Sequence, residues 1–344
     1  METRLIVEDL INPDGLIELQ RRSTYAERRV LADEIAGRVN AHLAEKGICR
    51  LEETHRREED AHLEALNLKG YATVGRVLEP GQIEDVLAYF KETPCFNAHL
   101  IARSDQVGRW PGAGAEDYPF GSFRLEDVIE APHLLELANS PAMLSLAAGY
   151  LGCTPSLYSL NAWWSFPGHP VETRMTQGFH RDEDDFKNCV LLLYLTDTDA
   201  NTGAHEYIRA THRQDLTKNL LEGTPFPVIN LGSEEEPNWV RVEFEELFAG
   251  TGYDGDAVYA ELFGPQIDMI CGQSGEAFFS DPAGLHRARP PLNSARLIVW
   301  IRYGYYANKS YKADQLYPVE FDWGSGAVPD TARHRYINRL VLQS

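Results

Sequence analysis

The 344-residue chain is poor in cysteine and lacks the long apolar runs of membrane-spanning helices. Its five cysteines are scattered and form no C-x-x-C pair, so the sequence supports neither a disulfide framework nor a thiolate zinc site. No uninterrupted apolar stretch approaches the roughly 20 residues that a bilayer-spanning helix needs. The first residues, METRLIVEDLINPDG, show no basic segment followed by an apolar one, so we expect no secretory signal and a cytoplasmic protein.

Positive charge is also scarce. The chain has 32 Lys and Arg against 52 Asp and Glu, which gives a formal net charge of -20. Such a surface repels phosphate backbones and anionic lipids, so we expect neither a nucleic-acid partner nor a membrane partner. The negative charge does not by itself identify a substrate. The length and the 43% hydrophobic content are ample for a buried core.

The chain is predicted to divide into a helical extension and a catalytic domain. Residues 14–66 place apolar side chains at helical spacing among many charges, so residues 1–66 are predicted to be an N-terminal helical extension or a homodimer contact. Residues 67–344 are predicted to be the domain that carries the chemistry. An acidic, irregular segment at about 231–256 interrupts it and is interpreted as an insertion.

The second half of the chain has the texture of strands. Runs rich in Val, Ile, Leu and aromatic residues alternate with turn residues such as Asn201-Thr202-Gly203. The predicted strands are SLYSLNAWWSF, NCVLLLYLTD, AHEYI, IDMIC, EAFFS and ARLIVWIRYGYYA. Successive strands without intervening helices predict an antiparallel sandwich or barrel.

The stretch FHRDEDDF contains the first candidate metal ligands. His180 and Asp182 are separated by one residue, and on an extended strand such residues point to the same side. An imidazole and a carboxylate are two-thirds of the facial triad that holds Fe(II) and leaves coordination positions open. The third ligand must come from a distant segment, and His286 in DPAGLHRARPP is the best candidate.

An arginine ten residues beyond His286 completes the pattern. Arg296 is the second residue of the predicted strand ARLIVWIRYG, and we expect it to project toward the metal from a neighbouring strand. A guanidinium pairs with a carboxylate through two parallel hydrogen bonds, as a dicarboxylate co-substrate bound to the metal would need. Arg302 is the rival candidate, because residues six apart share a strand face where no bulge intervenes.

These motifs resemble a known family. FHRDEDDF, CVLLLYLTDTDANTGAHEYIRATHR and GLHRARPPLNSARL are similar to the phytanoyl-CoA dioxygenase family of Fe(II)- and 2-oxoglutarate-dependent oxygenases, over about residues 70–307. The resemblance implies a mainly β fold with α, in which helices flank a double-stranded β-helix (jelly roll or cupin-like) core. It also implies an oxidoreductase that binds Fe(II) through His180, Asp182 and His286, uses 2-oxoglutarate and O2, and hydroxylates or otherwise oxidises a small metabolite with succinate and CO2 as co-products.

The resemblance assigns further residues to the co-substrate pocket. The family's arginine falls on Arg296, and Asn161, Trp163 and Gln177 occupy positions that often line this pocket. Ordinary strand packing is the competing interpretation for these three residues. His205 lies in a predicted strand near the core, where a buried histidine with satisfied hydrogen bonds is the favoured interpretation.

Two other classes of function stay open. A metal-dependent hydrolase or isomerase on a cupin-like barrel would use the same three ligands without 2-oxoglutarate or O2. A binding or scaffold protein with a degenerate barrel is the third class. Glu183, Asp184 and Asp185 follow the motif as competing carboxylates, and we interpret them as surface charge or as a hydrogen-bonding shell around the site.

Overall fold

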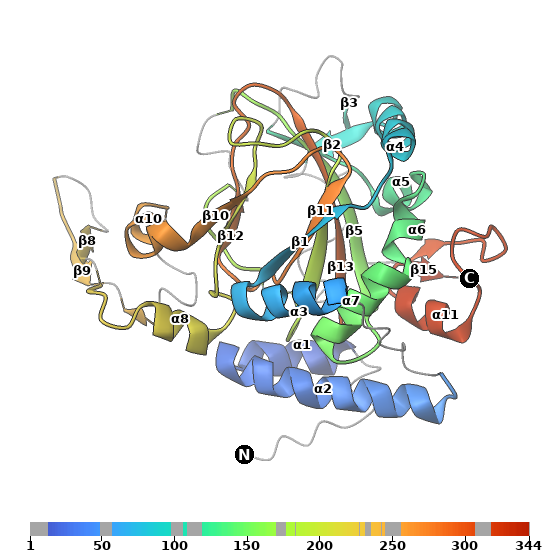
Figure 1. Cartoon of the computed structure of the whole chain (residues 1–344), viewed down its shortest axis with the longest axis horizontal. Coiled ribbons are helices and arrows are strands. Elements are labelled where there is room, and N and C mark those ends of the chain that lie inside the picture. The colour runs from blue at the N-terminus through green and yellow to red at the C-terminus, as the bar shows by residue number, and fades with distance from the viewer. Residues whose placement is uncertain are drawn as a thin grey trace.

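A computed structural model gives the structure of the chain. It describes residues 13–48, 57–97, 106–108, 119–169, 177–182, 184–226, 228–230, 235–241, 243–244, 256–306 and 318–343. Antiparallel sheets form its centre and helices cover one side (Figure 1).

The larger sheet contains eight of the described strands, and every neighbouring pair is antiparallel. In spatial order the strands are β1 (Tyr71–Arg76), β11 (Glu276–Ser280), β6 (Cys189–Tyr194), β13 (Arg296–Gly304), β5 (Ser156–Ser165), β4 (Phe120–Ser122), β2 (Cys95–Asn97) and β3 (Gln106–Gly108). The predicted strands of the second half of the chain are therefore confirmed where they enter this sheet.

A smaller antiparallel sheet contains the predicted strands AHEYI and IDMIC. Its described strands, in spatial order, are β10 (Ile267–Ile270), β7 (His205–Ile208) and β12 (His286–Ala288). Apolar side chains of both sheets meet in one cluster, in which Tyr207 and Ile270 from the smaller sheet join Leu192, Phe278 and Ile298 from the larger one. We call the space between the two sheets the barrel interior.

The side chains of β13 alternate between the barrel interior and the opposite face of the sheet. Ile298 joins the interior cluster, so Arg296, Trp300 and Arg302 lie on the same face of the strand. Leu297 and its alternate neighbours belong to the larger core beneath the helices. The bulge in the pairing with β5 comes after Arg302, so the register that unites the two arginines is regular. In β6 every residue is buried, because both faces of the sheet are covered.

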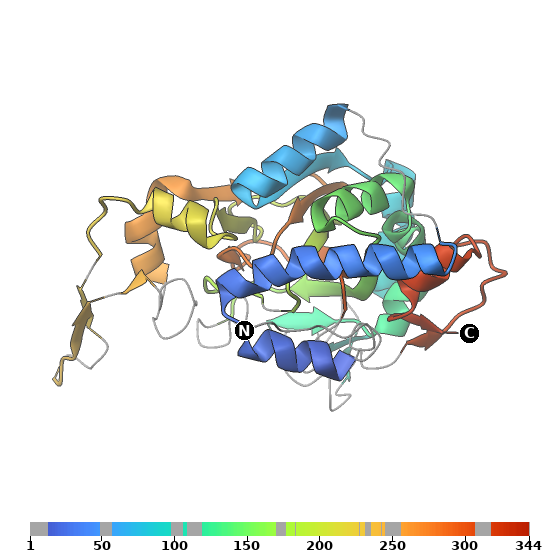
Figure 2. The same cartoon turned by 90° about the horizontal axis from the view of Figure 1, so that it is seen from below.

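The helices that cover the larger sheet come from the N-terminal half and from the C-terminal end of the chain (Figures 1 and 2). The described helices are α1 (Pro13–Arg22), α2 (Tyr25–Glu45), α3 (Arg57–Lys69), α4 (Pro80–Glu92), α5 (Leu125–Glu130), α6 (Leu134–Ala138), α7 (Pro141–Leu151), α8 (Gln214–Leu220), α10 (Asp256–Phe263) and α11 (Ala332–Asn338). The helical character predicted for the first 66 residues is confirmed for α1, α2 and α3. A capping box at Thr24 and Glu27 starts α2.

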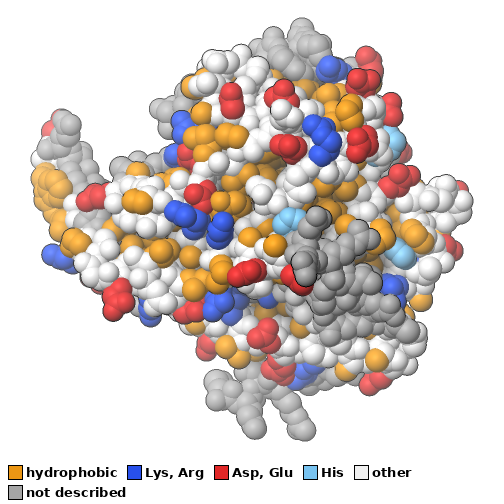
Figure 3. Space-filling view, viewed as in Figure 1, with side chains coloured by type: hydrophobic (Ala, Val, Ile, Leu, Met, Phe, Trp, Pro, Cys, Tyr) orange, Lys and Arg blue, Asp and Glu red, His pale blue; other side chains and the backbone are white. Residues whose placement is uncertain are grey.

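An arm extends from the body next to α8. It consists of the short antiparallel strands β8 (Val228–Asn230) and β9 (Trp239–Arg241), and Figures 1 and 2 show it standing away from the sheets. Val228 and Trp239 are exposed, and Figure 3 shows hydrophobic side chains on this arm. The predicted insertion at 231–256 overlaps the arm, although much of it lies outside the described residues. Within the described parts of the chain, every helix is too short or too polar to cross a bilayer.

The junction between α3 and β1 leaves no room for a side chain. Gly70 has a φ of +89°, and a Cβ there would overlap the Tyr207 hydroxyl and the His212 ring. Gly75, at the other end of β1, has a φ of +73° but open space around it.

Gly70→Ala is therefore expected to destabilise the protein by more than about 3 kcal/mol, because backbone strain adds to overlap with buried side chains. Gly75→Ala should cost only the backbone strain, about 1 kcal/mol. Urea unfolding of the two variants measures the difference. Equal losses of unfolding free energy would contradict the packing argument.

Candidate metal centre

Two remote segments of the chain meet at the candidate centre. His180 and His286 form an isolated antiparallel bridge in which each backbone N–H donates to the other residue's carbonyl, at 3.0 Å in both directions. Their imidazole centroids lie 4.4 Å apart. His286 begins β12, whereas His180 belongs to a loop, so the expected extended strand at FHRD is reduced to this single bridge.

The same local hydrogen bond orients both imidazoles. Nδ1 of His180 lies 2.9 Å from the carbonyl of Gly178, and Nδ1 of His286 lies 2.8 Å from the carbonyl of Gly284. A carbonyl only accepts, so each Nδ1 carries the proton and each Nε2 keeps its lone pair for a metal.

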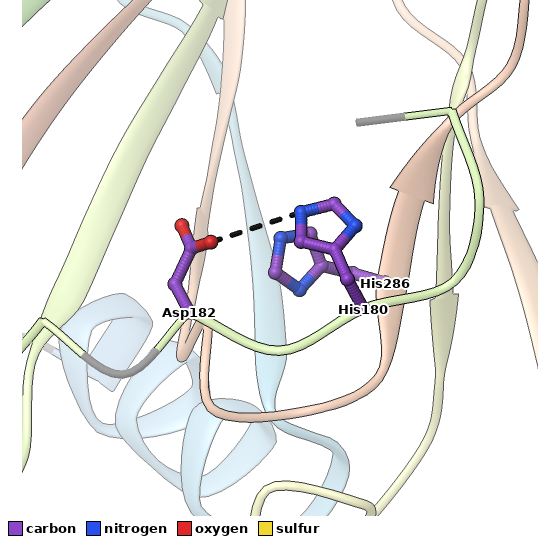
Figure 4. A group of neighbouring side chains, drawn as sticks. All are labelled: His180, Asp182 and His286. Carbon is purple, nitrogen blue, oxygen red and sulfur yellow. Dashed lines mark ion pairs between the residues drawn. The ribbon is translucent and has the colours of Figure 1, made fainter. Parts of the chain in front are cut away.

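Asp182 supplies the third ligand atom. Its Oδ1 lies 3.7 Å from Nε2 of His180 (Figure 4). One ligand atom from each of His180, Asp182 and His286 lies within 4.8 Å of the other two. The three predicted ligands are therefore brought together, in a geometry that one divalent cation fits.

Arg302 determines which oxygen of Asp182 is available. Its Nη2 donates to Oδ2 of Asp182 at 2.8 Å, and its Nη1 lies 3.5 Å from Oδ2 of Asp184. Burial opposes the charge on Arg302, but Asp184 and Asp182 outweigh it and raise the pKa of the guanidinium. Oδ2 of Asp182 is thus engaged, and Oδ1 faces the imidazoles. Sequence reasoning had considered Arg302 only as an alternative to Arg296.

Two of the three carboxylates after the motif are buried, and the third, Glu183, lies outside the described residues. Asp184 accepts a hydrogen bond from the Tyr158 hydroxyl at 3.2 Å, next to Arg302. Asp185 accepts from the backbone N–H groups of Phe186, Tyr305 and Tyr306. Burial raises the pKa of Asp185 to about 8, against those hydrogen bonds. Asp184 and Asp185 therefore belong to a hydrogen-bonding shell and not to the surface.

Burial also favours the metal-binding form of the second histidine. Burial, and then the neighbouring His180, lower the pKa of His286 to about 4. At pH 7 the imidazole is neutral, and a metal meets no competing proton on Nε2.

The loop between β11 and β12 accepts hydrogen bonds from the segment that contains His180 and Asp182. The backbone N–H of Asp182 donates to the carbonyl of Pro282 at 2.8 Å, and the guanidinium of Arg181 donates to the carbonyl of Ala283. Tyr25, at the start of α2, donates to the same Ala283 carbonyl at 3.1 Å. The N-terminal helical layer therefore contacts the loop that carries His286.

A buried ion pair fixes this loop to α2. The Asp281 side chain is fully buried, pairs with Arg29 of α2 and accepts a hydrogen bond from the Tyr150 hydroxyl at 2.5 Å. Burial alone would raise the pKa of Asp281, but Arg29, His212 and the hydrogen bonds hold it below its usual value.

Arg296 lies on the opposite side of the barrel interior from the position expected. It was predicted to project from a strand next to His286, but β13 lies between β6 and β5 in the larger sheet and His286 lies in the smaller one. The prediction of a neighbouring strand is wrong, because the turn after His286 carries the chain from one sheet to the other. The Arg296 side chain crosses back and donates to the carbonyl of Gly203, next to β7, and to Oγ of Ser165 at 3.2 Å.

Arg296 is a buried cation that has no acidic partner in the part of the chain that the structure describes. It is 3% exposed, and burial lowers the pKa of its guanidinium. Its Nε has no hydrogen-bond partner, and no carboxylate pairs with it among the described residues. Burying an unpaired charge is costly, so the geometry favours an anion as the missing partner.

The three other predicted pocket residues differ in position. Asn161 and Trp163 lie opposite Trp300 and Ile298 in the β5–β13 register, so they share the interior face. The Trp163 indole N–H is buried without an acceptor among the described residues. Gln177 is buried three residues before His180.

His205 contradicts the interpretation of a satisfied core histidine. It is buried, but its Nε2 has no hydrogen-bond partner in the described part of the chain. Its ring stacks on that of His286 with centroids 5.3 Å apart. His212, by contrast, places Nε2 3.1 Å from the carbonyl of Asn67, as a structural histidine does.

Comparisons with known proteins give similarity at the level of solved structures only. No family profile matches the chain, and no curated protein matches it. The non-heme alpha-ketoglutarate-dependent epimerase SnoN from nogalamycin biosynthesis is 16% identical, with a TM-score of 0.48 over 79% of this chain and 92% of that one. AviO1 from Streptomyces viridochromogenes is 19% identical, with a TM-score of 0.43 over 75% and 98%. HygX from Streptomyces hygroscopicus, solved with nickel and 2-oxoglutarate, is 13% identical, with a TM-score of 0.44 over 81% and 94%.

The Asp281–Arg29 pair is expected to contribute strongly to stability. Asp281→Asn leaves the Arg29 guanidinium buried without its charge partner and should cost about 3–5 kcal/mol of unfolding free energy. Because the folded-state pKa of Asp281 is lowered, this contribution is complete above the unfolded value near 4 and is lost as pH falls through the folded value.

Urea unfolding at pH 7 and at pH 3 measures both effects. Asp330→Asn is the matched control, since it breaks an exposed pair with Arg335 and should leave stability close to wild type. An Asp281→Asn variant as stable as the wild type at pH 7 would refute the role given to the pair.

Proposed function

We propose that this chain is an Fe(II)- and 2-oxoglutarate-dependent dioxygenase that hydroxylates, or otherwise oxidises, a small molecule, with succinate and CO2 as co-products. One observation carries the proposal: one ligand atom from each of two imidazoles and one carboxylate converge, and a buried guanidinium without a carboxylate partner among the described residues faces the same interior. The resemblance of the motifs to the phytanoyl-CoA dioxygenase family is part of this proposal, as is a double-stranded β-helix formed by the two sheets.

The donor set fits Fe(II). Two imidazoles and one carboxylate form the facial arrangement used by non-haem iron oxygenases, and three further coordination positions stay open. The Nδ1 hydrogen bonds to Gly178 and Gly284 hold both rings in the required tautomer. When bound, the iron supplies O2 activation coupled to decarboxylation of the keto acid. Zinc or nickel would also bind these ligands.

The residues around the ligands have distinct roles in this proposal. Arg302 holds Oδ2 of Asp182, so that the carboxylate presents Oδ1 to the metal. Arg296 pairs with the distal carboxylate of 2-oxoglutarate and so gains its missing counter-charge. The interior lined by Trp163, Trp300 and Phe278 excludes water from the reacting centre.

A metal-dependent hydrolase or isomerase on a cupin-like barrel is the alternative. It would use the same three ligands, but it needs no dicarboxylate and therefore gives Arg296 no counter-charge. The unpaired Arg296 guanidinium is the feature that favours the oxygenase over this alternative.

The first test is anaerobic reconstitution with Fe(II) and 2-oxoglutarate. The wild type should develop a weak visible charge-transfer band, and His180→Ala should lose it because one of the three metal ligands is gone. His62→Ala is the control, since it removes a histidine from α3 and should keep the band. Purified protein that consumes neither oxygen nor the keto acid would contradict the proposal.

The second test separates metal binding from co-substrate binding. Arg296→Met should raise the Kd of 2-oxoglutarate about 100-fold or more, since two charge-assisted hydrogen bonds are lost, while metal affinity stays near wild type. Arg296→Lys should fall between, because an ammonium keeps the charge without the paired donors.

Calorimetric titration of the Ni(II)-loaded protein with 2-oxoglutarate gives the Kd of the co-substrate. Titration of the metal-free protein with Ni(II) gives the Kd of the metal. Arg213→Met, which removes an exposed arginine paired with Asp215, is the matched control. Unchanged 2-oxoglutarate affinity in Arg296→Met would favour the hydrolase or isomerase.

A further inference from the structure

His205 lies between the metal centre and Arg296. It begins β7, and the β7–β12 register places it opposite Ala288, one pair along from His286. Its imidazole stacks on His286 on one side and packs against Phe278, with centroids 5.2 Å apart, on another. The carbonyl of Gly203, two residues before it, accepts from Arg296.

Contacts connect His205 to both the metal centre and Arg296. Its ring stacks on that of His286, and the carbonyl two residues before it in the chain accepts a hydrogen bond from Arg296. A molecule bound to the metal at one end and to Arg296 at the other would pass beside it.

Two buried polar atoms also indicate a ligand at this position. Nε2 of His205 and Nε of Arg296 are both buried without a partner among the described residues. Native proteins rarely leave buried polar atoms unpaired, and such atoms at one site indicate a missing ligand. Both atoms can be satisfied by a ligand that is rich in acceptors.

The imidazole of His205 can act as a donor at this position. With its proton on Nε2, an imidazole donates one hydrogen bond from that atom. Carboxylate and keto oxygens accept such a bond.

We propose that His205 is a co-substrate-binding residue, which donates from Nε2 to the keto acid held between the metal and Arg296 and limits the length of acid that fits. The inference rests on the proposed function and goes beyond it, because it adds a hydrogen-bond donor to the metal ligands and Arg296. The ligand class is a 2-oxo dicarboxylate with five carbons in its chain.

The position of the donor atom gives a sharp test. His205→Gln places an amide N–H near the position of Nε2, whereas His205→Asn reaches only as far as Nδ1. His205→Leu removes the polar group but keeps much of the volume. The Kd of 2-oxoglutarate is measured by calorimetry on the Ni(II)-loaded protein, with the Kd of Ni(II) and the melting temperature measured on each variant.

His205→Leu and His205→Asn should each raise the Kd of 2-oxoglutarate about 10- to 100-fold, the effect of losing one hydrogen bond to a charged group. His205→Gln should stay within a few-fold of wild type, and all three variants should keep their affinity for Ni(II). His42→Asn, on α2, is the control for replacing a histidine away from the barrel.

Chain length provides an independent measurement. His205→Ala opens space beside the co-substrate, so the affinity for 2-oxoadipate relative to 2-oxoglutarate should rise about fourfold, as expected for burying one further methylene. The loss of the hydrogen bond from His205 affects both acids and cancels in the ratio of their affinities. This measurement also tests the proposal if the His205→Leu variant fails to fold.

The outcomes separate this inference from the proposed function. Unchanged 2-oxoglutarate binding in His205→Leu overturns the role of His205 and leaves the oxygenase intact. Equal loss in His205→Gln and His205→Leu overturns the donor role. A wild-type protein that binds Ni(II) but not 2-oxoglutarate overturns both proposals.

Discussion

The reciprocal backbone pair between His180 and His286 is the interaction on which the rest of the site depends. It joins a loop to the first residue of β12 and brings two imidazoles from remote parts of the chain within 4.4 Å of each other. Each ring then repeats the same local contact, from Nδ1 to the carbonyl two residues earlier. Both Nε2 atoms are therefore left with a lone pair for a metal, in rings whose orientation is already fixed. Metal binding would then require little rearrangement of these side chains.

Charge is distributed unequally across the barrel interior. At one end of β13, Arg302 is balanced by Asp182 and Asp184; at the other end, Arg296 is buried with no carboxylate paired to it in the described part of the chain. The two arginines lie on the same face of β13, in a stretch of regular register. Arg302, beside the metal ligands, has its charge neutralised, whereas the charge of Arg296 is not neutralised by any described carboxylate. His205 lies along the facing strand between these regions. This asymmetry is the physical basis on which we propose a dicarboxylate as the ligand of the interior.

The sequence predicted the features that depend on local pattern. The unbroken apolar run of β6 and the alternation along β13 reflect a sheet covered on both faces, and the spacing of His180 and Asp182 is a local motif. It did not predict which sheet each strand would join, because sheet partners are set by tertiary packing. Arg296 was therefore assigned to a neighbouring strand. The Arg302–Asp182 pair and the missing hydrogen-bond partner of His205 Nε2 among the described residues depend on distances between the two sheets, so the sequence could not predict them. The one sequence signal for Arg302 was its six-residue spacing from Arg296.

The most direct test of the central claim is an anomalous-scattering map from crystals grown without oxygen in Mn(II) and 2-oxoglutarate. The account predicts one manganese peak bound by Nε2 of His180, Nε2 of His286 and Oδ1 of Asp182, with the distal carboxylate of the keto acid on Arg296. A manganese peak elsewhere, or a keto acid that does not contact Arg296, would contradict it.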